Sequence, residues 1–107
     1  MVQRYFVYIT TNSSKHVLYT GMTNDLEKRL TEHYLNRGQK KTVAGRYYAY
    51  HLIYFETYES PMAAIEREKE LTGWNKQKKE SLINKANPNW TFYNDRFMEW
   101  PPKIILS

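Results

Sequence analysis

Apolar and aromatic residues form short blocks in the first part of the chain, separated by polar segments. Residues 5–10 make a continuous apolar-aromatic run, which is typical of a strand that is buried on both faces and therefore central in its sheet. Residues 11–15 are polar and turn-like, and residues 17–20 form a second short strand before Gly21. The pattern predicts that the chain begins with an antiparallel hairpin.

Two tyrosines define the predicted register of this hairpin. If the turn is centred on Ser13 and Ser14, Tyr8 lies directly opposite Tyr19, with the two Cβ atoms about 5 Å apart. A shift of one residue would move the two rings to opposite faces of the sheet. We therefore expect Tyr8 and Tyr19 to form a facing pair.

A helix is expected after the hairpin. Asn24 followed by Glu27 resembles a capping box, which starts a helix. Arg29 lies at the edge of the inner face, one turn before His33. The inner face carries apolar and aromatic residues at helical spacing, namely Leu26, Leu30, His33 and Tyr34.

A third strand at residues 52–55 and two more helices complete the predicted elements. Ser60 and Pro61 predict a helix start, with a serine cap and proline at the first helical position. Gly73 predicts the end of that helix, and the last helix is expected over residues 75–85. This order of elements predicts an α/β fold with a small three-stranded mixed or antiparallel sheet flanked by helices.

The chain has 107 residues, which suits one domain. We expect residues 1–85 to form that domain and the aromatic tail, residues 86–107, to pack back on it. The sequence has no cysteine, no apolar run of about 18 residues and no signal-peptide pattern. These features predict a cytoplasmic protein without disulfides and without a membrane partner.

The net charge of +5 favours a polyanionic partner such as nucleic acid. Residues 36–46 are predicted to form a loop without any acidic residue. This loop and the last helix carry the residues that we expect to contact a nucleic-acid backbone: Arg37, Lys40, Lys41, Arg46, Lys76, Lys78 and Lys79. An ordinary solvated basic loop is the alternative.

Glu68 is the acidic residue that is hardest to explain. A helical wheel puts it between Ala64 and Leu71, on the face aimed at the sheet. An unpaired carboxylate that faces a core costs several kcal/mol. It therefore needs either a salt bridge, for example to Arg29, or a hard divalent ion such as Mg²⁺. The sequence leaves both explanations open.

Other candidate residues suit phosphoryl chemistry. A tyrosine such as Tyr8 or Tyr19 can orient or deprotonate an attacking water. The guanidinium of Arg29 matches phosphate oxygens, and His33 could act as a general base or proton relay. Each of these residues also has an ordinary alternative, because tyrosine and histidine often pack in cores and arginine often lies on helix surfaces.

The order and spacing of these residues resemble the GIY-YIG nuclease domain. The matching motifs are Phe6-Val7-Tyr8, Tyr19-Thr20-Gly21, Arg29 with His33, and the segment 64–68 that ends in Glu68. The similarity covers about residues 4–85 and is greatest to the small single-domain branch, which resembles the N-terminal nuclease of excinuclease C. Phe6 and Val7 replace the glycine and isoleucine of the first motif, and Thr20 replaces the middle residue of the second.

The resemblance implies metal-dependent phosphodiester cleavage with one divalent ion, Mg²⁺ or Mn²⁺. By position, Tyr19 would be the tyrosine on the side of the base, and Tyr8 would support it. Arg29 would stabilise the phosphate, and Glu68 would be the sole protein ligand of the metal. His33 matches a position where the family has tyrosine or histidine.

We therefore predict a GIY-YIG-type endonuclease that hydrolyses DNA, with repair or recombination as the processes to consider. RNA is an alternative substrate, and a protein partner could supply targeting. A nucleic-acid-binding module or adaptor with little intrinsic catalysis is the alternative function. A third hypothesis is a structural protein in which Glu68 is salt-bridged.

Overall fold

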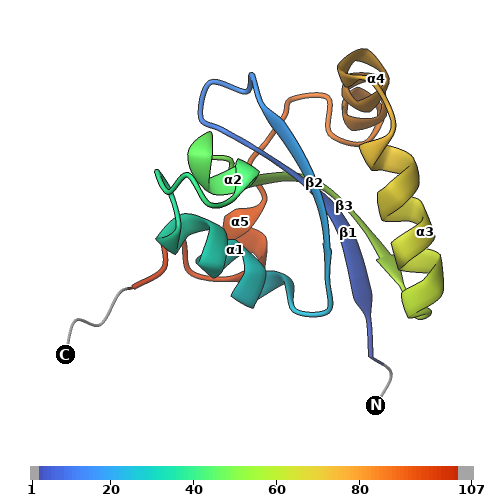
Figure 1. Cartoon of the computed structure of the whole chain (residues 1–107), viewed down its shortest axis with the longest axis horizontal. Helices are drawn as coiled ribbons and strands as arrows, with labels where there is room; N and C mark the ends of the chain where they lie inside the picture. Colours follow the sequence, from blue (N-terminus) through green and yellow to red (C-terminus); the bar gives the residue numbers. More distant parts are fainter. Residues whose placement is uncertain (1–2, 104–107) are drawn as a thin grey trace.

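The computed structural model describes residues 3–103 and contains one antiparallel sheet of three strands (Figure 1). The strands are β1 (Tyr5–Thr11), β2 (Leu18–Thr23) and β3 (His51–Tyr58), and their order in the sheet is β2-β1-β3. The run predicted to be a central strand is therefore central, and it pairs with a neighbour on each side. The predicted α/β fold with a three-stranded sheet is confirmed.

Helices cover both faces of this sheet (Figure 1). On one side lie α1 (Leu26–Leu35) and α5 (Asn94–Phe97), with the single turn α2 (Val43–Arg46) next to α1. On the other side lie α3 (Pro61–Thr72) and α4 (Lys76–Ala86). None of the helices within residues 3–103 is long and apolar enough to cross a bilayer.

Alternation along β1 separates the core into two layers. Tyr8 packs with Leu30 of α1 on one face, where Phe97 and Trp100 also contact the cluster. Val7 packs on the opposite face with residues of α3. Successive strand residues point to opposite faces, so the motif tyrosine and the segment that carries Glu68 lie in different layers.

The predicted register of the hairpin is wrong by two residues. Tyr8 pairs with Gly21, and Tyr19 pairs with Thr10. Because side chains alternate with a period of two, a shift of two residues preserves the face on which each ring lies. The two tyrosines are therefore diagonal neighbours on one face, with ring centroids 6.3 Å apart.

The connection between β1 and β2 explains this shift. The side-chain Oδ1 of Asn12 accepts hydrogen bonds from the backbone N–H of His16 at 2.9 Å and of Val17 at 3.1 Å. The backbone carbonyl of Asn12 accepts from Lys15 N–H at 2.9 Å, and Lys15 adopts a positive φ of 62°. These bonds lengthen the turn and move its centre one residue beyond the predicted position.

Helix boundaries follow the sequence signals closely, with two corrections. Ser60 caps α3, Pro61 is its first residue and Gly73 follows its end, as predicted. The cap of α1 is Asp25 instead of Asn24, because the Asp25 side chain accepts from the N–H of Lys28. The segment 36–46, predicted to be a loop throughout, contains α2, which Thr42 caps.

The C-terminal segment contacts the outer edge of β3. The side chain of Asn94 accepts a hydrogen bond from Leu52 N–H at 2.7 Å and donates one to the carbonyl of Tyr50 at 2.8 Å. The buried side chain of Asn87 donates to the carbonyl of Ile53 at 2.9 Å. Residues 1–2 of the predicted domain and 104–107 of the predicted tail lie outside the described residues.

Candidate active site

A hydrogen bond joins β1 to α1 at the centre of the candidate site. Tyr8 Oη and His33 Nε2 are 2.9 Å apart, and both side chains are buried. Tyr8 is on the central strand, whereas His33 is in the last turn of α1, on its inner face. The register of α1 on the sheet therefore brings together two residues that are 25 positions apart.

Tyr19 completes an aromatic cluster around this pair. Its ring lies 6.3 Å from the ring of Tyr8 and 5.3 Å from that of His33, in an edge-to-face arrangement with the histidine. Unlike Tyr8, Tyr19 is partly exposed. Of the two motif tyrosines, Tyr19 is thus the one whose side chain meets solvent.

Gly21 makes room for the ring of Tyr8. A Cβ atom at position 21 would lie 2.4 Å from Tyr8 Oη and 2.6 Å from its Cζ. No residue with a side chain fits there unless the ring moves. The glycine of the second motif is therefore required by the tyrosine of the first.

The buried pair is held in its neutral form. Burial, reinforced by the nearby Tyr19, raises the pKa of Tyr8, and the positive charge of Arg29 only partly opposes this effect. Glu32 and Glu68 raise the pKa of Tyr8 further through their negative charge. Burial and Arg29 lower the pKa of His33 to about 4. Near neutral pH the site contains an uncharged phenol beside an uncharged imidazole.

Arg29 and Glu68 come from the two layers on either side of the sheet. Arg29 is on α1 and Glu68 is on α3, and both side chains are partly buried. The charges of both residues act on the hydroxyl of Tyr8. A cation and a carboxylate therefore lie within electrostatic range of one tyrosine, although they come from opposite sides of the sheet.

The position of Glu68 corrects one prediction. Only Ala64 and Leu71 of α3 are fully buried, so Glu68 lies at the margin of the core-facing stripe instead of at its centre. Its Oε1 accepts a hydrogen bond from Thr72 Oγ1 at 3.2 Å. Among residues 3–103, Glu68 forms no ion pair with Arg29 or with any other cation, so the salt-bridge explanation for Glu68 finds no support.

The donor set suits a hard divalent ion that keeps most of its water. The part of the chain that the structure describes has no group of three or more His, Cys, Asp or Glu side chains able to enclose a metal. Glu68 offers a carboxylate that is partly exposed and has no ion-pair partner within residues 3–103. Mg²⁺ and Mn²⁺ accept one carboxylate with water and substrate phosphate as the other ligands, which fits this arrangement.

The basic residues fall into two groups in different layers. Arg37, Lys40, Lys41 and Arg46 are exposed around α2, next to α1. On α4, Lys76 and Lys78 are exposed as well, although Lys76 Nζ donates to the carbonyl of His16 and Lys78 Nζ lies 4.3 Å from the ring centre of Trp74, while Lys79 is partly buried. Burial lowers the pKa of Lys79. The basic residues near α2 and those of α4 therefore lie on separate elements of the chain.

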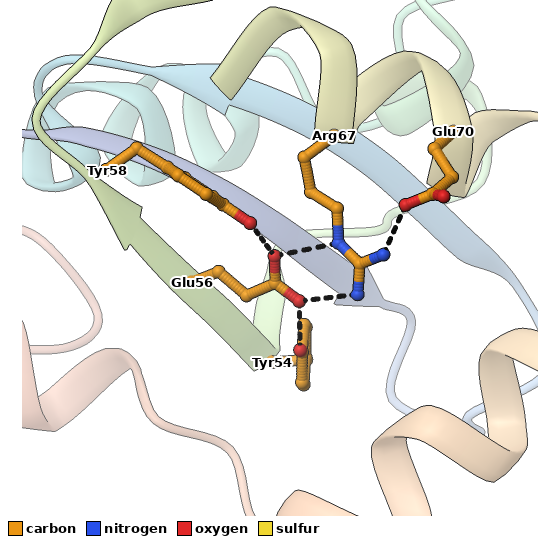
Figure 2. A network of polar contacts seen from close by, with 5 residues as sticks. All are labelled: Tyr54, Glu56, Tyr58, Arg67 and Glu70. Carbon is orange, nitrogen blue, oxygen red and sulfur yellow. Dashed lines mark hydrogen bonds and ion pairs between the residues drawn. The ribbon is translucent and has the colours of Figure 1, made fainter. Parts of the chain in front are cut away.

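Sequence reasoning missed a polar network between β3 and α3 (Figure 2). Arg67 Nε and Nη2 donate to the two carboxylate oxygens of Glu56, both at 2.9 Å. Tyr58 Oη donates to the same carboxylate at 2.6 Å, Tyr54 Oη also donates to it, and Arg67 Nη1 contacts Glu70. The only signal was the alternation of Tyr54, Glu56 and Tyr58, which puts all three on one face of a strand.

Comparisons with known proteins agree with the fold and with the motifs. A family model described as the GIY-YIG catalytic domain matches residues 4–81. A UPF0213 protein of Haloquadratum walsbyi is 38% identical over 82 residues, which cover 77% of this chain and 89% of that protein. A UPF0213 protein of Staphylococcus aureus is 39% identical over 79 residues, covering 74% and 93% of the two chains.

A solved structure shows the same architecture. The solution NMR structure of a UPF0213 protein from Bacillus halodurans has a TM-score of 0.50 and 26% sequence identity to this chain. The match covers 87% of this chain and 93% of that one. The similarity therefore extends over most of the sheet and its helices.

Proposed function

Because the chain belongs to the GIY-YIG family of endonucleases, we propose that it hydrolyses phosphodiester bonds in DNA with one divalent ion, Mg²⁺ or Mn²⁺. One observation carries this proposal more than any other. The neutral Tyr8–His33 pair lies beside a partly exposed Tyr19 and within range of the charges of Arg29 and Glu68. This combination suits water activation next to a negatively charged phosphate.

The exposure of the two tyrosines supports different roles for them. Tyr19 is partly exposed, so its hydroxyl can accept a hydrogen bond from a water molecule and orient it toward phosphorus. Tyr8 is fully buried and positions the cluster from behind. His33 is neutral near pH 7 because burial and Arg29 lower its pKa, so its imidazole would orient the hydroxyl of Tyr8 through their hydrogen bond.

Arg29 and Glu68 would act on the phosphate and on the metal. The guanidinium of Arg29 can donate two hydrogen bonds to phosphate oxygens and stabilise the charge that develops on them. Glu68 would hold the divalent ion, and its partly exposed carboxylate leaves room for water and phosphate beside it. When bound, the ion would supply additional positive charge at the scissile phosphate.

The substrate would be held mainly through its backbone. The exposed group around α2 is close to α1, which also carries Arg29 and His33. Cations of this kind bind phosphate without reading sequence, so we propose little intrinsic sequence specificity. DNA repair or recombination is the process that suits such an activity, with RNA as the competing substrate and a protein partner as a source of targeting.

A plasmid-nicking assay tests the function. The purified protein is incubated with supercoiled plasmid and Mn²⁺ or Mg²⁺, beside Glu68→Gln and Arg29→Ala. We expect each substitution to lower the rate by about 10²–10³-fold, because each removes charge stabilisation specific to the reaction. Matched controls are Glu66→Gln and Lys28→Ala, which remove the same charges from exposed neighbouring positions and should retain activity.

The outcomes separate the competing functions. Equal nicking by the wild type and both site variants would show that the activity comes from a contaminant. A salt-sensitive shift of DNA mobility without nicking at any metal concentration would favour a nucleic-acid-binding module or adaptor. Faster cleavage of a matched RNA than of DNA would mean that RNA is the substrate, and the assignment of the active-site residues would stand.

A further inference from the structure

Only two residues of α3 are fully buried against the sheet. Its two fully buried side chains, Ala64 and Leu71, are seven residues apart and pack with Val7 of β1. Positions seven apart lie along one line of a helix, and apolar contacts are not directional. Rotation of α3 about this line would move every residue beside it, including Glu68.

Arg67 supplies the directional contact that this line lacks. Its guanidinium is bound in a fork by Glu56 through Nε and Nη2, both at 2.9 Å, and Glu70 contacts it on the other side. Figure 2 shows the arginine reaching from the helix to the strand, where its partner points toward it. A bidentate arginine–carboxylate pair fixes both distance and angle, so it sets the position and the rotation of α3.

Glu56 is itself held by the strand that carries it. Tyr58 Oη donates to its carboxylate at 2.6 Å, and Tyr54 Oη donates to the other oxygen. Burial alone would raise the pKa of Glu56, but the hydrogen bonds from Arg67 and the two tyrosines outweigh burial and lower it. The carboxylate therefore stays ionised and has four donors, which makes it a rigid anchor.

The anchor is connected directly to the candidate site at both ends. On the helix, Arg67 immediately precedes Glu68, and the two side chains diverge by about 100° around the axis. In the sheet, Glu56 pairs with Val7, the residue before Tyr8. The Glu56–Arg67 contact therefore links the helix position next to Glu68 to the strand position next to Tyr8.

We propose that Glu56, acting through Arg67, is a positioning residue that holds the carboxylate of Glu68 at the tyrosine cluster and so sets the affinity for the divalent ion. This inference rests on the proposed function, because Glu68 is taken as the metal ligand. Glu56 is not itself proposed as a ligand, since both of its carboxylate oxygens already accept from donors. Outer-shell groups that orient a ligand typically change metal affinity by about 10–100-fold when they are replaced.

The experiment measures Mn²⁺ binding directly, without DNA, from the electron paramagnetic resonance signal of free Mn²⁺ during a titration. Glu56→Gln keeps the size of the side chain but removes the charge that holds the arginine fork, so we expect binding to weaken about tenfold. Glu66→Gln removes the same charge from an exposed position on α3 and should change affinity less than twofold. The concentration of Mn²⁺ that gives half-maximal plasmid nicking should follow the same order.

Arg67→Lys provides a second, independent variant if Glu56→Gln does not fold. It keeps the positive charge but cannot form the fork, so Mn²⁺ binding should weaken here too. Urea unfolding of each variant separates positioning from stability. A lower urea midpoint with unchanged Mn²⁺ affinity would show that the network only stabilises the fold, and would overturn the proposal.

Glu68→Gln distinguishes a failure of this proposal from a failure of the proposed function. Wild-type binding that is lost in Glu68→Gln but unchanged in Glu56→Gln and Arg67→Lys would overturn the positioning role alone. Equal Mn²⁺ binding by the wild type and Glu68→Gln would overturn both, because Glu68 would then not be the ligand. If Mn²⁺ binding is lost in Glu68→Gln and weakens about tenfold in Glu56→Gln, the result supports both the proposed function and the positioning role.

Discussion

Tyr8 Oη lies 2.9 Å from His33 Nε2, and this hydrogen bond is buried between the central strand and α1. The bond joins a phenol and an imidazole that are both neutral near pH 7, since burial raises the pKa of Tyr8 and lowers that of His33 to about 4. The hydrogen bond between two neutral groups satisfies both of them without creating a buried charge. The pair therefore links the stability of the fold to the protonation state of the site.

The pH dependence of stability follows from the pKa of His33. The folded-state value of about 4 lies below the ordinary value of about 6.5 in an unfolded chain. Between these values the unfolded state binds more protons, so the free energy of unfolding should fall as the pH falls from about 6.5 to about 4. The loss from this group is at most about 3.5 kcal/mol.

Urea unfolding at a series of pH values measures this effect, with His33→Gln beside the wild type. The variant should lose stability less steeply than the wild type between pH 6.5 and 4.5. His51→Gln is the matched control, because burial also lowers the pKa of His51 and its contribution must be separated. Parallel curves for the wild type and His33→Gln would mean that the folded-state pKa of His33 is close to 6.5.

Gly21→Ala tests the close approach of the two strands at the site. The added Cβ would lie 2.4 Å from Tyr8 Oη and 2.6 Å from Cζ, so the ring must move away from His33. We expect a loss of about 1–3 kcal/mol in the free energy of unfolding, measured by urea or thermal unfolding. A displaced Tyr8 should also lower the rate of nicking.

Gly73→Ala is the control for that substitution. Its Cβ would meet only two backbone carbonyl oxygens, at 3.5 and 3.6 Å, which is ordinary contact distance. Gly73 has φ −77° and ψ −12°, a conformation that alanine adopts readily, so Gly73→Ala should stabilise the protein by up to about 1 kcal/mol. Equal stabilities of the two variants would contradict the proximity of Tyr8 to position 21.

Much of the fold could be predicted from the sequence because its signals are local. The continuous apolar run indicated a central strand, and Ser60 with Pro61 indicated the start of α3. The hairpin register was missed because it depends on the side chain of Asn12, which bonds to two backbone N–H groups later in the turn. Such a bond is compatible with several turn lengths and is not visible in an apolar pattern.

The candidate site was only partly predictable for a related reason. Helical spacing puts Arg29 and His33 on neighbouring positions of one helix, and the motif tyrosines share a face of the sheet under either register. The partner of Glu56 could not be predicted, because it is 11 residues away on another element. The burial of Glu68 was overestimated because a helical wheel gives direction around the axis but not the distance to the sheet edge.

The two groups of basic residues should contribute unequally to DNA binding. Lys40, Lys41, Lys76 and Lys78 are all exposed, but Lys76 and Lys78 also contact the carbonyl of His16 and the ring of Trp74. Lys40→Ala with Lys41→Ala should weaken binding and lower the slope of log affinity against log salt by about 2, since each phosphate contact contributes about 0.9. Fluorescence anisotropy with a labelled duplex at several salt concentrations measures this slope.

Lys76→Ala with Lys78→Ala removes the same charge from α4 and serves as the matched control. It should change the slope by less than one unit, because these side chains are already in contact with the protein. An equal change of slope in both double variants would mean that the nucleic acid contacts both layers of the protein.

Asn94 tests how the C-terminal segment is coupled to the sheet. Its side chain is 2% exposed and bonds to Leu52 N–H at 2.7 Å and to the carbonyl of Tyr50 at 2.8 Å. Asn94→Ala would leave the buried N–H of Leu52 and the partly buried carbonyl of Tyr50 without these partners, at a cost of about 1–3 kcal/mol each. We expect a loss of about 2–6 kcal/mol in the free energy of unfolding.

Asn94→Asp separates the two bonds, because it has nearly the same shape as asparagine. The carboxylate of the aspartate still accepts a hydrogen bond from Leu52 N–H, but it has no donor for the carbonyl of Tyr50. Asn94→Asp should therefore also destabilise the protein at pH 7. Asn89→Ala, at an exposed position in the same segment, should stay within about 0.5 kcal/mol of the wild type. If Asn94→Ala proved as stable as Asn89→Ala in urea unfolding, the C-terminal segment would not be part of the cooperative fold. The outer edge of β3 would then need another partner.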